Sequence, residues 1–381
     1  MRICLYTETA LPKVGGQEMV VDALARQYLD LGHEPVVLAP YPRKQSVRGE
    51  RYPYRVVRHP RFYSTHLLVG WYRWFLWKFY RQWPFDVLHC HGIYPPAYLA
   101  SLLGNTLPVP VVVTSHGGDV YHDNVRLKKP VVKERCIAGI RGADALVAIS
   151  RFTRDGFTRL CPEVASRVVD IPNGVHLGAL RQPATKPPVW NDQLKPGTYG
   201  VFLGRLKHRK GVDTLLDAVA RMTAPHQQFA IAGDGEERAD LEGRARLLGL
   251  TSRVHFLGST TGPTKAYLLQ NARFLVIPSR NWEAFPLVVL EAFASGLPIL
   301  GTKIPGVEDL IEPGRTGLVV PPESPVEMAA ALDRLSEDDG LVSRLGAEAY
   351  ARADQYDWPV VARRHLDLYQ SLMATQSRRA A

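Results

Sequence analysis

The chain has few cysteines and no long apolar run, and these two absences exclude several classes of protein. Its 381 residues include four cysteines with no CxxC spacing, which argues against a disulfide framework and against a cysteine zinc site. No run of about 18 apolar residues occurs, so we expect no membrane-spanning helix. The first expected strand is followed by Glu8 before the apolar core of a signal peptide could form. We therefore expect a cytoplasmic protein in a reducing compartment.

Acidic residues are scarce in the first half of the chain only. Residues 1–190 hold 25 Lys and Arg against 14 Asp and Glu, while residues 191–381 hold 22 against 23. Much of the excess lies in residues 41–83, which carry ten basic residues and a single acid, Glu50. This asymmetry predicts that one domain meets an anionic partner.

What the sequence does contain is a regular alternation of short apolar runs and helical patterns. Hydrophobic residues make up 46% of the chain and charged residues 22%, which is typical of globular proteins, and the length suits two domains. Apolar strands separated by helices predict α/β domains with parallel sheets covered on both faces. The expected strands lie at 3–7, 35–39, 86–90, 109–115, 145–149, 200–203, 228–232, 254–257 and 274–277, with an alanine- and leucine-rich helix between those at 86–90 and 109–115.

The alternation stops at 181–199, a proline-rich segment that we interpret as a linker. We predict an N-terminal, acceptor-side domain at 1–183, a second domain at 184–357 and a final helix at 358–381 that packs back on the first. Two such domains favour a ligand site in a cleft between them, at the carboxyl ends of the strands.

The most specific motif is the segment at 279–302, SRNWEAFPLVVLEAFASGLPILGT. Glu283 lies in a loop after an expected strand, and Glu291 follows eight residues later inside the next helix. A solvated surface acid is the simpler interpretation of each glutamate. Glu291, however, stands among apolar residues, where an unpaired acid is costly, and this favours a functional role.

The start of that helix is an expected anion site. Proline suits the first helical turn, so we expect the helix to begin near Pro286. The backbone N–H groups near Phe285, Leu287 and Val288 would then point at a bound phosphate. A phosphate in that position would leave one of the two glutamates near a sugar and the other near a ribose.

A basic loop follows the strand at 200–203. Arg205 and Lys210 lie beside its glycines and are the better functional candidates, whereas Lys207 and Arg209 suit a solvated turn. Such a loop can neutralise a diphosphate leaving group without a metal ion, and the sequence contains no DxD-type metal motif.

Two weaker motifs follow strands of the first domain. Gly15 and Gly16 stand at a strand-to-helix junction, where glycine lets the backbone approach a phosphate, although they do not form the dinucleotide motif GxGxxG. His116 lies at the end of the strand at 109–115 and would point into the cleft. A structural turn residue is the alternative for His116.

Taken in order, these motifs resemble the retaining glycosyltransferases of family 4, which have the GT-B fold, and the resemblance covers roughly residues 1–370. It rests on the two glycines and on SHGGD at 115–119, IPNGV at 171–175, GRLKHRKG at 204–211, AGDGE at 232–236, and E-x₇-E followed by ASGLPILGT up to 302. The E-x₇-E segment and the basic loop are the specific parts. The resemblance implies two Rossmann-like domains with parallel sheets that face each other across a deep cleft.

The resemblance also implies a role for each candidate residue. Catalysis would involve His116, lining the sugar subsite, and Glu283, holding the transferred sugar. The implied donor-binding residues are Gly15, Gly16, Arg205, Lys210, Glu291, Phe285, Leu287 and Val288, with the glycines, Arg205 and Lys210 at the phosphates and Glu291 at the ribose. The sequence Phe285-Pro286-Leu287 departs from the pattern of many members, and this departure concerns the choice of donor sugar.

The implied activity is transfer of a sugar from a nucleotide-diphosphate sugar to an acceptor with retention, and with no metal or other cofactor. A nucleotide-sugar epimerase with the same fold, a soluble small-molecule glycosyltransferase and a non-catalytic nucleotide-sugar-binding protein remain as alternatives. The sequence does not identify the nucleobase, the sugar, the acceptor or the oligomeric state.

Three histidines offer a rival site. His89 and His91 lie on one face of a strand, and with His116 on a neighbouring strand they could imitate a three-histidine zinc site. No carboxylate pattern supports a metal there, so we prefer the interpretation that these histidines line the acceptor side of the cleft.

The segment at 71–83 holds four of the seven tryptophans together with Arg73, Lys78 and Arg81. Aromatic and basic residues on one helix are typical of an interfacial helix, so residues 41–83 predict contact with an anionic membrane surface. A helix packed on the sheet with exposed cations is the alternative. The acceptor would then be lipid-linked or part of a surface polysaccharide, reached at the inner face of the membrane. No nucleic-acid-binding motif accompanies the basic charge, so nucleic acid is not an expected partner.

Overall fold

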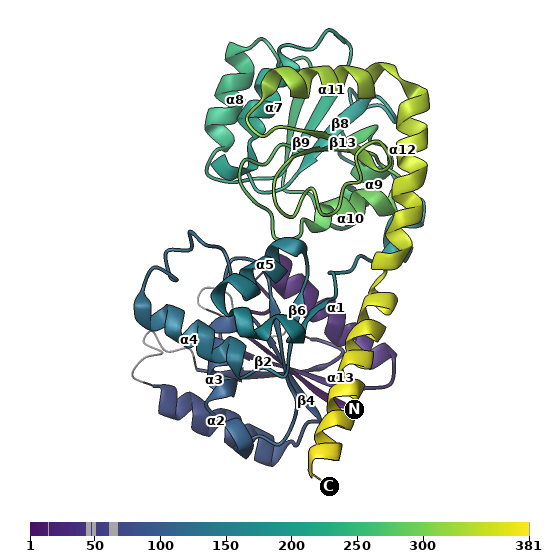
Figure 1. Ribbon diagram of the computed structural model, residues 1–381. Coiled ribbons are helices and arrows are strands. Elements are labelled where there is room, and N and C mark those ends of the chain that lie inside the picture. The colour runs from purple at the N-terminus through teal and green to yellow at the C-terminus, as the bar shows by residue number, and fades with distance from the viewer. Residues whose placement is uncertain (14, 43–46, 48–50, 61–67, 381) are drawn as a thin grey trace. The chain divides into compact units, whose positions relative to one another are not determined.

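The computed structural model describes residues 1–13, 15–42, 47, 51–60 and 68–380 (Figure 1). These residues form two compact units: the first contains residues 1–173 and the last helix, and the second is Gly174–Asp357. The border thus lies before the proline-rich segment at 181–199. That segment packs within the second unit, where the N–H of Ala184 donates to Gln270 Oε1 at 2.8 Å.

The first unit is built on a seven-stranded sheet in the order β3-β2-β1-β4-β5-β6-β7, with every neighbouring pair parallel. Short apolar runs of Val, Ile and Leu supply the central strands, which are buried on both faces, as expected for a parallel sheet. The strands are β1 (Arg2–Thr7), β2 (Glu34–Pro40), β3 (Arg55–His59), β4 (Val87–His91), β5 (Val111–Ser115), β6 (Ala145–Ala148) and β7 (Val168–Asp170).

Helices cover both faces of this sheet. Alternate residues of a strand face opposite sides, so Leu88 and Cys90 of β4 join the core beneath α2, α3 and α4, while His89 faces the side of α1 and α13. There the Tyr369 hydroxyl of α13 bonds both His89 Nδ1, at 2.6 Å, and the Tyr28 hydroxyl of α1, at 2.9 Å. The helices are α1 (Gly16–Asp30), α2 (Val69–Gln82), α3 (Tyr98–Ser101), α4 (Pro130–Arg141), α5 (Arg151–Leu160) and α13 (Trp358–Ala380).

The second unit is built on a six-stranded parallel sheet in the order β10-β9-β8-β11-β12-β13. One face carries a core in which Phe202, Phe229 and Phe274 pack under α7, α8 and α11. The strands are β8 (Tyr199–Leu203), β9 (Gln228–Ala232), β10 (Val254–Gly258), β11 (Phe274–Ile277), β12 (Ile299–Thr302) and β13 (Gly317–Val320). The helices are α6 (Leu177–Arg181), α7 (Val212–Val219), α8 (Arg238–Leu247), α9 (Gly262–Gln270), α10 (Leu287–Ala294), α11 (Pro325–Glu337) and α12 (Asp339–Arg352). Short helical turns of the two units lie at Ile93–Ala97, Gly104–Thr106, Pro162–Arg167, His208–Lys210 and Ala353–Tyr356.

The structure departs from the sequence-based expectation in one helix of the first unit. An alanine- and leucine-rich helix was expected between β4 and β5, but α3 spans only Tyr98–Ser101. Pro95 and Pro96 precede it, and a proline lacks the N–H that a longer helix would need. Strands β3, β7, β12 and β13 were not expected. Among the described residues, no helix has the length and apolar character needed to cross a membrane.

Candidate functional site

The strand order of each sheet contains one switch point, and the loops that carry the motifs lie at or near it. In the first unit the order reverses direction between β1 and β4, and in the second unit between β8 and β11. In open α/β sheets, ligands bind beyond the carboxyl ends of the strands at such a switch point. The loops after β1 and β4 begin at this edge of the first unit. The basic loop after β8 and the glutamate loop after β11 begin at this edge of the second.

Glu283 lies at the centre of the second unit's switch point. Its side chain is only 7% exposed, and its Oε1 atom accepts hydrogen bonds from Lys210 Nζ at 2.7 Å and from Ser279 Oγ at 2.8 Å. Arg209 Nη1 lies 3.4 Å from the same oxygen. Burial alone would raise the pKa of Glu283, but the charges of Lys210 and Arg209 and the two hydrogen bonds lower that pKa below its ordinary value. The structure thus brings Glu283 and Lys210 together as a buried ion pair.

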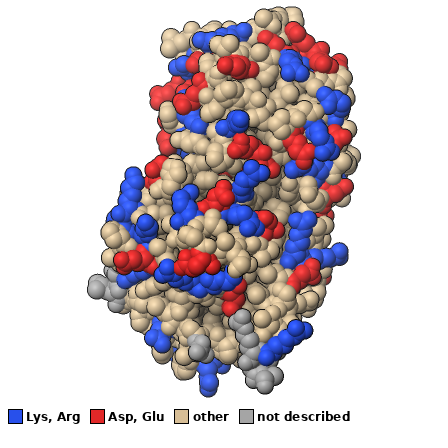
Figure 2. Space-filling model, in the orientation of Figure 1, with Lys and Arg blue, Asp and Glu red and all other residues tan. Residues whose placement is uncertain are grey.

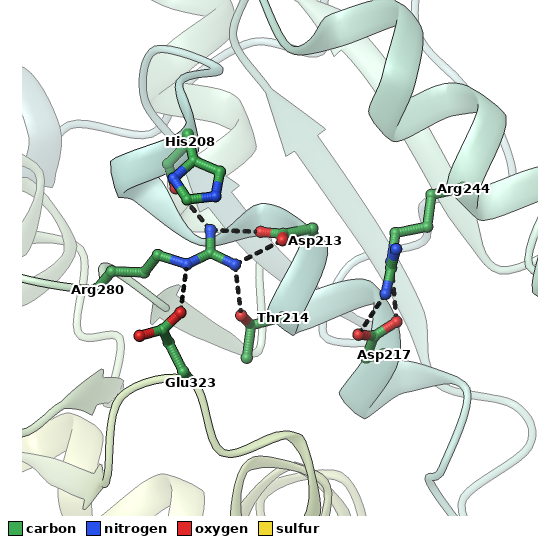
Figure 3. A network of polar contacts seen from close by, with 7 residues as sticks. All are labelled: His208, Asp213, Thr214, Asp217, Arg244, Arg280 and Glu323. Carbon is green, nitrogen blue, oxygen red and sulfur yellow. Dashed lines mark hydrogen bonds and ion pairs between the residues drawn. The ribbon is translucent and has the colours of Figure 1, made fainter.

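A second ion-pair network joins the basic loop to the glutamate loop (Figure 3). The Arg280 guanidinium donates to both carboxylate oxygens of Asp213, at 2.7 and 2.5 Å, and to the His208 carbonyl at 2.6 Å. Its Nε–H donates to Glu323 Oε1 at 2.9 Å. The backbones of the two loops also pack closely, because a Cβ atom on Gly211 (φ +65°) would lie 2.0 Å from the Pro278 carbonyl oxygen.

Glu291 is placed in the second turn of α10 and is ion-paired as well. Lys265 Nζ of α9 lies 2.6 Å from Glu291 Oε1, and the two side chains are 28% and 21% exposed. The apolar neighbours therefore do not leave this acid unpaired. Helix α10 begins at Leu287, and Pro286 occupies the capping position before it rather than the first turn.

The remaining donor-site candidates of the second unit are Arg205 in the basic loop and three residues between the two glutamates. Arg205 is exposed in the loop after β8. Phe285 is buried and packs edge-on against Tyr356, with ring centroids 6.2 Å apart. Leu287 and Val288 are half-buried in the first turn of α10, and none of the described side chains caps the N-terminus of this helix. The first backbone N–H groups of α10 therefore lie at the end of the loop that carries Glu283.

In the first unit, Gly15 and Gly16 begin α1 directly after the loop that follows β1. Gly15 has extended backbone angles, and a Cβ atom built on Gly16 would meet none of the described atoms within 4 Å. The fold itself therefore does not demand glycine at position 16. Beside the pair, the buried Glu18 carboxylate lies 2.8 Å from Lys13 Nζ; burial would raise its pKa, but its hydrogen bonds, chiefly from Lys13, lower it.

His116 follows β5 and contacts His91 of β4. His116 Nε2 lies 3.1 Å from His91 Nδ1, and the rings stack with centroids 5.3 Å apart. The loop that carries His116 is held by Asp119, which accepts hydrogen bonds from Ser115 Oγ and from the Ile93 N–H. Burial lowers the pKa of His116 to about 4, so its imidazole is neutral at pH 7.

The three-histidine interpretation is not supported by the geometry. Both ring nitrogens of His89 are engaged, Nδ1 by the Tyr369 hydroxyl and Nε2 by Thr114 Oγ1 at 2.7 Å. Among the described residues, no group of three His, Cys, Asp or Glu side chains could hold a metal ion. His89 and His91 are fully buried, so they are core residues of the first unit and do not line a ligand site as we expected.

Sequence reasoning missed several residues that hold the candidates in place. Arg209 was taken as a solvated residue, yet its guanidinium also donates to the Trp282 carbonyl at 3.2 Å and lies 5.3 Å from the Trp282 ring centroid. Lys265 and Arg280 were not singled out, because each pairs with an acid that is distant in sequence. Ser279 is the first residue of the motif, and a hydroxyl four residues before Glu283 was a usable signal.

Two family models match the chain and together cover most of it. The model described as Glycosyltransferase Family 4 matches residues 14–178, and the model described as Glycosyl transferases group 1 matches residues 193–352. The first match contains Gly15, Gly16 and the loop after β5, and the second contains the loops after β8 and β11. The candidate residues of each unit therefore lie within a matched region.

Curated relatives agree with these matches. The chain is 28% identical over 388 residues to a phosphatidyl-myo-inositol mannosyltransferase of Mycolicibacterium smegmatis, covering 98% of this chain and 94% of that protein. It is 30% identical over 275 residues to an alpha-D-kanosaminyltransferase of Streptomyces kanamyceticus, covering 68% of this chain and 70% of that protein.

Solved structures show the same fold at lower sequence identity. The Anabaena protein HepE, crystallised in complex with UDP, superposes with a TM-score of 0.80 at 20% identity, over 98% of this chain and 100% of that one. Sucrose-phosphate synthase from Thermosynechococcus elongatus superposes with a TM-score of 0.77 at 23% identity, over 98% and 99% of the two chains. The chain belongs to glycosyltransferase family 4 and is a glycosyltransferase with the GT-B fold.

Proposed function

We propose that this glycosyltransferase moves a sugar from a nucleoside diphosphate sugar to a carbohydrate or lipid-linked acceptor, with retention of anomeric configuration and without a metal ion. The observation that carries the proposal is the cluster of Lys210, Arg209 and Ser279 around the buried carboxylate of Glu283. It combines cations for a diphosphate with an acceptor of hydrogen bonds for a sugar hydroxyl. The complex of the Anabaena relative with UDP supports a donor of this class.

Three groups of residues would bind the diphosphate in this proposal. Lys210 and Arg205 supply positive charge from the loop after β8. The N–H groups of Leu287 and Val288 in the first turn of α10 supply backbone donors and the positive end of the helix dipole, and the N–H of Phe285 lies just before this helix. Gly15 and Gly16 would let the backbone of α1 approach the phosphates, which accounts for glycine at a position where the fold leaves room for a side chain.

The sugars would be held by carboxylates. Glu283 would accept hydrogen bonds from the transferred sugar, and Glu291 from the ribose hydroxyls, with Lys265 Nζ holding the Glu291 carboxylate in position. His116 would contact the transferred sugar near the reacting centre. Cationic groups at the diphosphate would stabilise the charge that develops as it leaves. Retention further requires that the acceptor attack from the face that the diphosphate leaves.

A donor panel tests the enzymatic part of the proposal. A nucleoside diphosphate sugar that binds should raise the melting temperature, because a ligand that binds only the folded state stabilises that state. Glu291→Ala should weaken donor binding, His116→Ala should mainly lower kcat, and EDTA should leave turnover unchanged. The anomeric configuration of the product, read by NMR, tests retention. Wild-type activity in both variants, or an isomerised donor formed without acceptor, would contradict the proposal.

The acceptor part of the proposal rests on α2. Its buried residues are Tyr72, Leu76 and Phe79, which pack against the sheet, whereas Trp74 and Trp77 are 48% and 41% exposed. Helix α2 contains no acid. Cations lie over the exposed rings: Lys78 Nζ is 4.8 Å from the Trp74 ring centroid, and the Arg81 guanidinium is 5.9 Å from that of Trp77.

Amphipathic tryptophans beside cations suit the headgroup region of an anionic bilayer, and we propose that α2 brings the enzyme to a lipid-linked acceptor there. Figure 2 shows basic and acidic side chains interspersed on its drawn face, so the surface does not present one continuous basic field there among the described residues. Other basic residues of the segment at 41–83, together with Glu50, lie outside the described residues, namely Arg43, Lys44, Arg48 and Arg61.

Liposome sedimentation tests this surface. Replacing Trp74 and Trp77 by alanine should reduce binding to anionic vesicles by about tenfold, and added salt should weaken the binding that remains. The control is replacement of Arg246 and Leu247, an exposed cation and an exposed apolar residue on α8. This replacement should leave binding to anionic vesicles unchanged. No binding by the unaltered protein, or equal loss in the control, would overturn the membrane proposal while leaving the donor proposal intact.

A further inference from the structure

The two histidines at the ends of β4 and β5 form one hydrogen bond between their rings. His91 Nδ1 and His116 Nε2 are 3.1 Å apart, and the ring planes differ by 20°. His91 is fully buried, whereas His116 is partly exposed. Both imidazoles are neutral near pH 7, because burial lowers the pKa of each. A neutral imidazole carries one proton, so one of the two facing nitrogens donates and the other accepts.

The surroundings of His91 decide which nitrogen donates. Its second nitrogen, Nε2, is buried and has no hydrogen-bond partner among the described residues. A proton on Nε2 would leave a buried N–H donor without an acceptor, which is rare in folded proteins, whereas an unshared lone pair is tolerated more readily. The proton of His91 is therefore assigned to Nδ1 from the hydrogen-bond network.

Resting on the function proposed above, we propose that His91 donates its Nδ1–H to Nε2 of His116 and so fixes His116 as the Nδ1–H tautomer. The nitrogen that His116 leaves for a ligand then carries a proton. In this tautomer His116 is a hydrogen-bond donor to an oxygen of the bound sugar or phosphate. It is not a base for the acceptor hydroxyl, because its one lone pair already accepts from His91.

His91 is thus a positioning residue that acts through His116. Its own place is fixed by the strand, since β4 pairs with β1 and β5 on its two sides. The Gln17 side chain adds a hydrogen bond from Nε2 to the His91 carbonyl oxygen at 3.0 Å and another to Thr7 Oγ1 at 2.9 Å. This arrangement holds the His91 ring against His116 before any ligand binds.

Long-range ¹H–¹⁵N correlation of histidine-labelled full-length protein at pH 7.5 tests the proposal without an assay. The signals of His116, assigned by their loss in His116→Asn, should show a protonated Nδ1 and an unprotonated Nε2. His91→Leu removes the donor and should release His116 to the Nε2–H tautomer, whereas His91→Asn keeps an N–H near the Nδ1 position and should preserve the native tautomer. An Nε2–H tautomer of His116 in the unaltered protein would overturn the proposal. If His91→Leu does not fold, the spectrum of the unaltered protein is sufficient to test the proposal.

Kinetics then separate the role of His91 from a purely structural one. In His91→Leu we expect kcat to fall by about tenfold, the equivalent of one hydrogen bond, with the KM for the donor little changed, and we expect His91→Asn to recover it. Equal losses in both variants would contradict a role through the tautomer. If the protein shows the expected tautomer but transfers a sugar from no donor, the proposed function is contradicted. The assignment of the His91–His116 hydrogen bond is then unaffected.

Discussion

Lys210 Nζ and Glu283 Oε1 lie 2.7 Å apart, and their side chains are 19% and 7% exposed. The pair joins the basic loop after β8 to the loop after β11, and it exists in the ligand-free chain. The lysine that we propose for the diphosphate is therefore already held in position by the glutamate that we propose for the sugar. A buried carboxylate paired in this way depends strongly on its cation.

Replacing one partner of this pair should cost stability, and replacing both should restore it. Lys210→Met leaves Glu283 buried with only Arg209 and Ser279, so we expect the free energy of unfolding to fall by about 2–3 kcal/mol. The double variant Lys210→Met/Glu283→Gln should recover most of that loss, because no uncompensated charge remains. Chemical unfolding measures both changes, and a double variant as unstable as Lys210→Met would contradict the buried-charge argument.

The Arg280 network should affect donor binding more than an ordinary ion pair does. Arg280→Met removes the contacts that tie His208 and Asp213 to the glutamate loop, so we expect the Kd for the donor to rise by about tenfold and stability to fall by about 2 kcal/mol. Arg244→Met is the control, since Arg244 makes a similar paired contact with Asp217, one turn along the same helix (Figure 3). Arg244 is more exposed, and its loss should cost about 0.5 kcal/mol with no change in Kd, as calorimetry can check.

Two glycines should respond to alanine in opposite ways. Gly16→Ala meets no described atom within 4 Å, so stability should stay equal or rise by up to about 1 kcal/mol while donor binding weakens. Gly211→Ala places a Cβ atom 2.0 Å from the Pro278 carbonyl oxygen at φ +65°, and should lower stability by about 3 kcal/mol. Thermal melting with and without donor distinguishes them. Unchanged donor affinity in Gly16→Ala would argue against a phosphate at this position.

Acid should destabilise the first unit through its buried histidines. Burial lowers the pKa of His116 to about 4, that of His365 to about 3, and those of His89 and His91 well below the ordinary value. Below about pH 6.5 the unfolded chain binds protons that the native unit does not bind. The free energy of unfolding should therefore fall as the pH drops from 6.5 towards 4, by up to about 1.4 kcal/mol per pH unit for each histidine.

A single substitution tests the source of this pH dependence. His365 Nδ1 is buried with no hydrogen-bond partner among the described residues, so His365→Phe removes a titrating group without breaking a hydrogen bond to that atom. The pH slope of the unfolding free energy should become shallower in this variant. It should be unchanged in His226→Gln, a substitution of an exposed histidine in the second unit. Identical slopes in His365→Phe and the unaltered protein would show that other groups dominate.

The architecture was largely predictable from the sequence, because parallel strands buried on both faces are near-continuous apolar runs. Strands β1, β8 and β11 were expected within one or two residues of their observed bounds. Strands β7 and β13 were missed, since their patterns are short and only partly buried. The helix after β4 is shorter than its alanine and leucine content predicts, because Pro95 and Pro96 lack the N–H groups that a longer helix would need.

The candidate site was predictable as a set of motifs but not as a set of contacts. Glu283 and Glu291 were found from sequence, yet the argument that Glu291 would be an unpaired acid failed because Lys265 reaches it from another helix. The pairing of Arg280 with Asp213 joins residues 67 positions apart, and nothing local indicates it. His91 and His116 were expected to line a site together, but only the fold shows that one is core and holds the other.

The last helix has a consequence for how the chain is made. Helix α13 supplies Tyr369, which bonds His89 and Tyr28, yet it is synthesised after the entire second unit. While residues 174–357 leave the ribosome, helix α13 does not yet cover the α1 side of the first sheet. Histidines of this sheet that are buried in the finished unit then face water. The second unit can thus finish folding first, and the first unit acquires the buried histidines that make it acid-sensitive only when the last helix arrives.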